Sequence, residues 1–172
     1  MKKENNSIRF FLNDSEVEAT SESRLLEIIK EEGLEIPHLC FNANYRPDGN
    51  CRSCLVEIEG ERNLAPSCCR KPKNGMKVYT HSQRAESSRK MILEMLSSDT
   101  EEHQASKKIN ELKEWSEKLR IDQVRMPKNI DKRIDNTNPA IAVNYEECIK
   151  CTRCIRACRE AQANDVIGFA FR

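Results

Sequence analysis

Residues 37–68 read PHLCFNANYRPDGNCRSCLVEIEGERNLAPSC, and this stretch decides how the N-terminal half of the chain folds. Its cysteines follow the spacing C-x10-C-x2-C-x13-C and are Cys40, Cys51, Cys54 and Cys68. Gly49 stands in a strong turn signal, Pro47 to Asn50, where a small residue lets the backbone approach a bound group closely. Residues 55–59 alternate like a half-buried strand. The stretch therefore predicts a cysteine site built on loops at the edge of a small sheet.

Four thiolates at one site can hold a [2Fe–2S] cluster, and coordination keeps their sulfurs ionised at neutral pH. A structural zinc ion is the alternative, but zinc sites usually pair two short cysteine knuckles, and only one short pair exists here. Disulfides are disfavoured because the nine cysteines are an odd number and the N-terminus carries no secretory signal. Cys69 directly follows Cys68, and we interpret it as a spare thiol because successive side chains diverge.

Composition excludes several classes of function. Of the 172 residues, 29 are basic and 28 acidic, giving a formal charge of +1, so no electrostatic footprint for nucleic acid is present. No stretch approaches the length of an apolar membrane span. A chain with neither a signal peptide nor a span is predicted to be cytoplasmic, where clustered cysteines usually serve metal or redox chemistry.

The segments around the cysteines predict an α+β fold. Strands are expected at 8–12 and 16–20 as a hairpin, and later at 55–59 and 76–80. Between the hairpin and the cysteines, the stretch SRLLEIIKEEG (residues 23–33) predicts a helix with an apolar face at Leu25, Leu26, Ile28 and Ile29, and Gly33 is the candidate stop. The order predicts a small mixed sheet wrapped around one helix.

The middle of the chain predicts helices and a linker. Residues 83–98 are expected to form a helix whose buried side carries Met91, Ile92, Met95 and Leu96. An amphipathic helix is expected next, with its apolar side at Ile109, Leu112, Trp115 and Leu119. Residues 125–139 are interpreted as a linker, and 140–144 as a short strand.

A second set of cysteines ends the chain, spaced C-x2-C-x2-C-x3-C at Cys148, Cys151, Cys154 and Cys158. In two-cluster ferredoxins, the first three cysteines of this run hold one [4Fe–4S] cluster and the fourth binds the other. The first three lie on a loop around one cluster, whereas the fourth lies on the following helix and points away. Cys158 is therefore predicted to bind a second [4Fe–4S] cluster or, alternatively, to be the fourth ligand of the first.

The segment from Ile8 to about Ser98 resembles the [2Fe–2S] β-grasp domain of several large redox subunits. These include the large iron–sulfur subunit of complex I, diaphorase subunits of hydrogenases, iron-only hydrogenases and the alpha subunit of NAD-dependent molybdenum or tungsten formate dehydrogenase. The stretches PDGNCRSCLVEIEGER and APSCCRKP look most like the formate dehydrogenase branch, as does NDVIGFAFR near the C-terminus. The resemblance implies a [2Fe–2S] domain at 1–82, a helical segment and linker at 83–138, and a partial [4Fe–4S] ferredoxin-type domain at 139–172.

One departure from that pattern lies in the middle segment. In the complex I and hydrogenase relatives, a histidine and three cysteines there hold a further [4Fe–4S] cluster. This chain has His103 but no cysteine in the region, so that cluster is not expected.

The resemblance implies a module that relays single electrons between a flavin/NAD diaphorase and a molybdopterin formate dehydrogenase site. It also implies that the chain is the N-terminal portion of such an alpha subunit, or one piece of a split one. A subunit of a hydrogenase or complex I-like assembly is the alternative, and a zinc-binding interaction module is a rival from another class. The sequence carries no catalytic triad, P-loop or dinucleotide fingerprint, so no catalytic residue is expected in this chain, although it would be part of an oxidoreductase.

Overall fold

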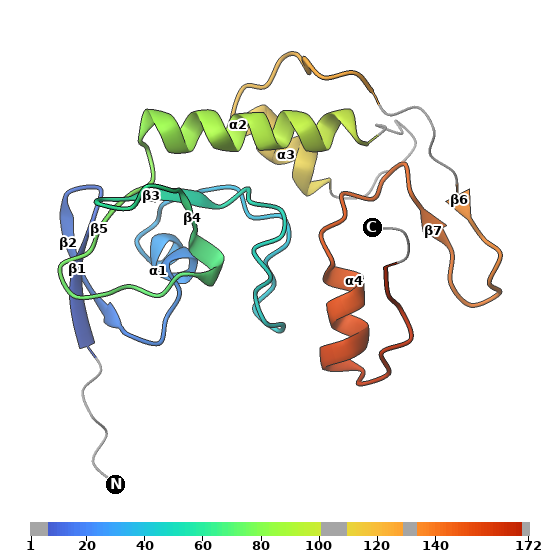
Figure 1. Cartoon of the computed structure of the whole chain (residues 1–172), viewed down its shortest axis with the longest axis horizontal. Helices are drawn as coiled ribbons and strands as arrows, with labels where there is room; N and C mark the ends of the chain where they lie inside the picture. Colours follow the sequence, from blue (N-terminus) through green and yellow to red (C-terminus); the bar gives the residue numbers. More distant parts are fainter. Residues whose placement is uncertain (1–6, 101–109, 129–133, 170–172) are drawn as a thin grey trace, which may run out of the picture. The chain divides into compact units, whose positions relative to one another are not determined.

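The N-terminal part of the chain is a mixed five-stranded sheet with one helix packed against it (Figure 1). The computed structural model describes residues 7–100, 110–128 and 134–169. The strands are β1 (Ser7–Leu12), β2 (Ser15–Thr20), β3 (Leu55–Ile58), β4 (Ala65–Pro66) and β5 (Lys77–Tyr79). They lie in the order β2-β1-β5-β3-β4, with β1 and β5 parallel and the other pairs antiparallel. The expected α+β fold is confirmed.

The first hairpin forms because its two-residue turn suits the twist of the strands. Asn13 and Asp14 have φ values of 49° and 70°, the left-handed conformation that such turns require and that these residue types tolerate. The turn sets the register, which places Phe10 opposite Val17 and buries both. The hairpin thus presents one apolar face to the helix.

Helix α1 (Leu25–Glu31) supplies the other half of this core. At its start, the Glu27 carboxylate accepts a hydrogen bond from the backbone N–H of Arg24, at 2.9 Å, as in a capping box. The chain leaves the helix at Gly33, whose φ of +73° is readily adopted only without a side chain.

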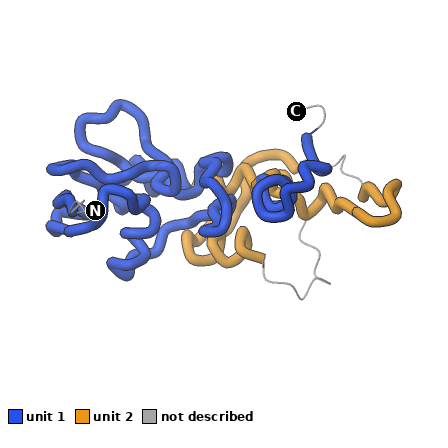
Figure 2. The backbone as a smooth tube through the Cα atoms, turned by 90° about the horizontal axis from the view of Figure 1, so that it is seen from below, with its two compact units in different colours: residues 1–89, 152–172 blue, residues 90–151 orange. Residues whose placement is uncertain are grey.

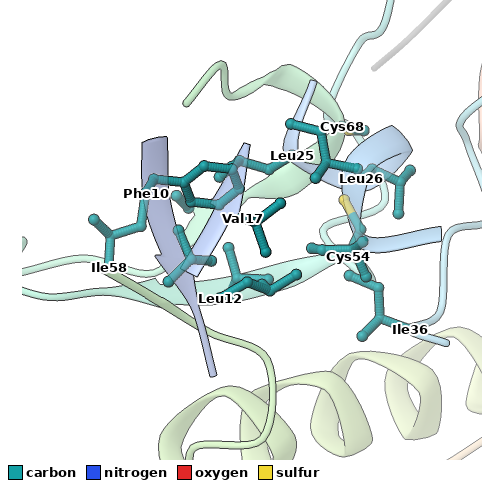
Figure 3. Close-up of a cluster of buried hydrophobic side chains, with 14 residues drawn as sticks. Phe10, Leu12, Val17, Leu25, Leu26, Ile36, Cys54, Ile58 and Cys68 are labelled. Atoms are coloured by element: carbon teal, nitrogen blue, oxygen red, sulfur yellow. The ribbon is translucent and has the colours of Figure 1, made fainter. Parts of the chain in front are cut away.

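Two of the first four cysteines belong to the hydrophobic core (Figure 3). Apolar side chains of α1, the sheet and nearby loops form one buried cluster, and Cys54 and Cys68 are part of it. The figure shows both cysteines alongside Leu25 and Leu26. The cysteine site is therefore anchored in the best-packed part of the domain, where side-chain rotation is restricted.

The remaining elements lie further along the chain. They are the short 3₁₀ helix η1 (Ser67–Cys69), α2 (Gln83–Ser98), α3 (Glu111–Lys118), β6 (Ile134–Asp135), β7 (Val143–Asn144), α4 (Arg153–Arg156) and the π-helical turn η2 (Ala157–Ala161). The chain divides into two compact units, residues 1–89 with 152–172, and residues 90–151 (Figure 2). The first unit thus contains both the sheet and the C-terminal helical turn. None of the helices in the described ranges is long and apolar enough to cross a lipid bilayer.

The structure corrects the expected buried face of α2. Met91 and Met95 are 42% and 54% exposed, so the prediction that they are buried is wrong. The buried row is instead Ala85, Arg89 and Leu93, which recur every four residues and therefore share one face. A charged residue in the middle of this row masked the periodicity in the sequence.

In the second unit, two expectations about strands change and one expected helix is present. The expected linker contains β6, which pairs antiparallel with β7, and the strand expected at 140–144 is reduced to Val143–Asn144. The expected amphipathic helix is present as α3, where Leu112 is buried and Trp115 half-buried. Ile109 lies outside the described residues, as does His103.

Candidate metal centre

The structure brings together the four cysteines of the first set from three separate segments. Cys40 lies in the loop after α1, Cys51 and Cys54 lie in the loop that leads into β3, and Cys68 lies in η1. All four are buried, with exposures between 0% for Cys68 and 9% for Cys51. Sequence positions up to 28 residues apart thus converge on one site shielded from water.

The sulfur atoms of this set interact with one another. The pKa of the Cys40 thiol is lowered to about 2 because Cys51 and Cys68 donate hydrogen bonds to its sulfur. The pKa of Cys54 is lowered to about 7, chiefly by a hydrogen bond from Cys68. Cys51 and Cys68 are the donors, so their pKa values are raised. In both thiols the largest cause is the hydrogen bond to Cys40.

Two buried serines fix the loops that carry these cysteines. The Ser53 hydroxyl accepts a hydrogen bond from the backbone N–H of Leu39 at 3.2 Å and lies 3.0 Å from the Cys51 sulfur. The hydroxyl and backbone N–H of Ser67 both donate to the carbonyl oxygen of Cys54, at 2.8 and 3.1 Å. Each serine thus ties two cysteine-bearing segments together.

Cys69 lies outside the buried set and packs over the glycine of the preceding loop. It is exposed, and its sulfur is 3.6 Å from that of Cys68. Gly49 has φ of +62°, and a Cβ at this position would lie 2.9 Å from the Cys69 sulfur. The loop therefore needs glycine both for its conformation and for this contact.

The cysteines near the C-terminus have different environments. Within the first unit, Cys154 is exposed on α4, whereas Cys158 is buried in η2 and its sulfur lies 3.4 Å from the backbone nitrogen of Val166. In the second unit, Cys148 and Cys151 are partly buried. Burial alone does not group these four thiols into one site.

Within the first unit, the C-terminal helical turn contacts the loop that follows Cys40. The Thr152 hydroxyl donates to the Asp48 carboxylate at 2.8 Å, and the backbone N–H of Arg46 donates to the Glu160 carboxylate at 2.7 Å. Arg156 is buried and donates to the backbone carbonyls of Arg46, at 2.9 Å, and of Cys40. A residue of the C-terminal motif therefore touches the backbone of the first cysteine set.

A second buried arginine, Arg89 on α2, lies near the same set. It is 2% exposed, and its guanidinium donates to the carbonyls of Thr80 and Leu55, at 2.5 and 3.4 Å. Within the described part of the chain its Nε has no hydrogen-bond partner. Burial lowers the pKa of the group, while Glu86 and Cys54 act in the opposite direction. Sequence reasoning missed both arginines, although Arg89 is recognisable as a charge on an otherwise apolar helical row.

These observations test whether the residues fit an iron–sulfur cluster. The donor set consists of four buried soft thiols, and buried cations nearby suit an anionic group. Among the described residues, no three His, Cys, Asp or Glu side chains are grouped so as to hold a metal ion. A single ion needs all ligands around one point, whereas a two-iron cluster takes its four thiolates on two irons. Four buried cysteines that converge from three separate segments suit the second arrangement, so the residues fit.

Comparison with known proteins agrees with this geometry. Residues 5–83 match the family model described as "2Fe-2S iron-sulfur cluster binding domain". The match covers less than half of the chain, and it includes the sheet, α1 and the whole first cysteine set.

Curated relatives extend beyond the [2Fe–2S] domain. An NADH-quinone oxidoreductase subunit of Rhizobium meliloti is 30% identical over 170 residues, which cover 94% of this chain and 20% of that protein. The mitochondrial NADH-ubiquinone oxidoreductase 78 kDa subunit of Candida albicans is 32% identical over 155 residues, covering 85% of this chain and 20% of that protein. The chain thus spans about a fifth of the length of these relatives.

A solved structure shares the fold. An NAD+-reducing [NiFe]-hydrogenase crystallised in the H2-reduced state superimposes with a TM-score of 0.84 over 96% of this chain and 71% of that one. The sequences are 24% identical, so this similarity shows the fold alone. The formate dehydrogenase branch that the resemblance favoured is not among these relatives.

Proposed function

We propose that the chain is an electron-transfer module that relays single electrons through a [2Fe–2S] cluster held by Cys40, Cys51, Cys54 and Cys68. The convergence of these four buried thiols within the residues that match the [2Fe–2S] family model carries the proposal. When bound, such a cluster gains and loses one electron without making or breaking a bond to a substrate.

The residues of this chain would hold the cluster rigidly, shield it from water and set its reduction potential. Cys54 and Cys68 are part of the packed core, and Ser53 and Ser67 hold their loops, so the ligands would move little between oxidation states. Burial excludes water, which strengthens every charge interaction at the site. Hydrogen bonding and solvent exposure are the means by which proteins tune cluster potentials.

We extend the proposal to the C-terminal motif on the basis of its spacing. Cys148, Cys151 and Cys154 would bind a [4Fe–4S] cluster, and Cys158 would bind a second cluster or complete the first. The contacts of residues 152–160 with the loop at 40–48 support a functional link to the [2Fe–2S] domain. The division into parts at 1–82, 83–138 and 139–172 belongs to the same proposal.

For partners, we propose the other subunits of a large oxidoreductase assembly. The relatives named as NADH-quinone and NADH-ubiquinone oxidoreductase subunits support an assembly of the complex I type. The sequence resemblance around Cys51 and Cys68 supports a flavin/NAD diaphorase on one side and a molybdopterin formate dehydrogenase on the other. Reduced thiols favour the cytoplasm as the place where the clusters are assembled.

Metal analysis of the anaerobically purified chain separates this proposal from a zinc-binding module. We expect iron and acid-labile sulfide in equal amounts and little zinc, because the buried set provides four thiolates to a two-iron centre. The measurement is iron, zinc and sulfide per chain, with visible absorbance. A colourless chain with stoichiometric zinc and no labile sulfide would establish the zinc-binding alternative instead.

A further inference from the structure

Two arginines reach the first cysteine set from outside the loops that carry the cysteines. Arg89 comes from α2 and Arg156 from α4, and they are 2% and 6% exposed. Burying a guanidinium is unfavourable unless an anion or hydrogen-bond acceptors compensate it. Two buried cations beside one site therefore favour a negatively charged group at that site.

The side chain of Arg156 contacts the backbone of Cys40. Its guanidinium donates to the carbonyl of Cys40 and to that of Arg46, and its Nε donates to the Thr152 hydroxyl at 3.1 Å. The guanidinium carbon also lies 5.8 Å from the centre of the Tyr45 ring, within the range of a cation–π contact. Five donors in a planar fork make arginine suited to bridging several acceptors at once.

Arg89 lies beside the segment that carries Cys54. It donates to the carbonyl of Leu55, the residue that follows Cys54, and to that of Thr80 at the end of β5. These two acceptors are neutral carbonyls, and one of its donors, Nε, is buried without a hydrogen-bond partner among the residues that the structure describes. A buried cation with neutral acceptors is electrostatically compensated once a negatively charged group occupies the neighbouring cysteines.

We propose that Arg89 and Arg156 set the reduction potential of the [2Fe–2S] site by stabilising its reduced form. This inference rests on the proposed ligation by Cys40 and Cys54. A thiolate-bound cluster is an anion, and a single added electron makes it more negative, with no bond formed and no proton required. A buried cation therefore favours the reduced state over the oxidised one, because Coulomb interactions are strong where water is excluded.

The test is an EPR-monitored reductive titration of the full chain carrying Arg89→Gln or Arg156→Gln, with dithionite as the one-electron reductant. In each variant we expect the ratio of reduced to oxidised [2Fe–2S] cluster at a fixed ambient potential to fall at least tenfold. For one electron this equals a potential about 59 mV lower. Glutamine keeps hydrogen-bond donors but removes the charge.

Matched controls are available on α2 and on η2, the helical turn that directly follows α4. Arg84 on α2 and Arg159 in η2 are exposed, with side-chain exposures of 48% and 56%. The Arg84→Gln and Arg159→Gln variants remove the same charge where water and salt screen it, so their ratio of reduced to oxidised cluster should stay close to that of the parent. Equal shifts in buried and exposed variants would overturn the proposal, as would unchanged potentials in both buried variants with intact clusters.

Lysine variants cover the case in which a glutamine variant does not hold its cluster. Arg89→Lys and Arg156→Lys keep the charge but lose the planar fork. We expect them to load the cluster at a potential close to that of the parent, and a tenfold loss of the reduced form in them would contradict a role for the charge. If the proposed [2Fe–2S] ligation itself is wrong, the result is different, because the parent chain would then contain neither iron nor labile sulfide.

Discussion

The Cys68→Ser variant is expected to lose its [2Fe–2S] cluster, whereas the Cys69→Ser variant keeps it. Cys68 is fully buried and its thiol interacts with those of Cys40 and Cys54, so its removal breaks the middle of the ligand set. Loss of groups that only support metal ligands typically costs about 10–100-fold in affinity, and loss of a ligand should cost more. Iron and labile sulfide per chain, with visible absorbance, measure the outcome.

Cys69 is the matched control because it is the same residue type one position away. It is exposed and packs over Gly49 rather than among the other thiols. Equal cluster loss in both variants would contradict the assignment of Cys68, and so would a Cys68→Ser variant with parental iron content. Far-ultraviolet circular dichroism, which reports the backbone, should match the parent in both variants, since a serine is nearly isosteric with cysteine.

The second large effect concerns the C-terminal motif. The Cys151→Ser variant should lose the [4Fe–4S] signal, whereas Cys158→Ser should retain most of it, because we assign Cys158 to a different cluster. The [2Fe–2S] cluster has four buried cysteines, so it should be more stable than the [4Fe–4S] cluster, to which we assign three. Anaerobic iron and sulfide analysis, with EPR of the reduced proteins, distinguishes the two variants.

The alternative assignment of Cys158 has its own outcome. If Cys158→Ser removes the [4Fe–4S] signal as fully as Cys151→Ser does, Cys158 is the fourth ligand of the same cluster. In both variants the [2Fe–2S] signal should be unchanged, which serves as the internal control for folding.

Local signals in the sequence were sufficient to predict most of the [2Fe–2S] domain. The hairpin of β1 and β2 followed from the Asn13-Asp14 turn and alternating residues, and α1 from its apolar face before Gly33. The α+β class follows from the order of these elements. β4 was missed because it has only two residues and includes Pro66, which weakens any strand pattern.

Features that depend on long-range packing were not predictable in the same way. Burial of Arg89 and exposure of Met91 and Met95 depend on what packs against α2, which no periodicity argument contains. The contact of Arg156 with the Cys40 carbonyl joins residues 116 positions apart. Spacing alone could propose the cysteines as ligands, but it could not show which charges surround them.

Neither the sequence motifs nor the fold identifies the partner proteins. The stretches around Cys51 and Cys68 favoured formate dehydrogenase, while the curated relatives are NADH-quinone and NADH-ubiquinone oxidoreductase subunits. A [2Fe–2S] domain can serve many assemblies, because its cluster hands on electrons whatever their source.

The central claim is that the first cysteine set holds a centre that takes up one electron. Its most direct test is an anaerobic reductive titration of the purified full chain, followed by EPR at each step. We predict no [2Fe–2S] signal in the oxidised protein and a half-integer-spin signal that grows to one spin per [2Fe–2S] cluster on uptake of one electron, and that is missing from Cys68→Ser. A chain that binds iron but develops no such signal on full reduction, or that keeps it in Cys68→Ser, would contradict the account.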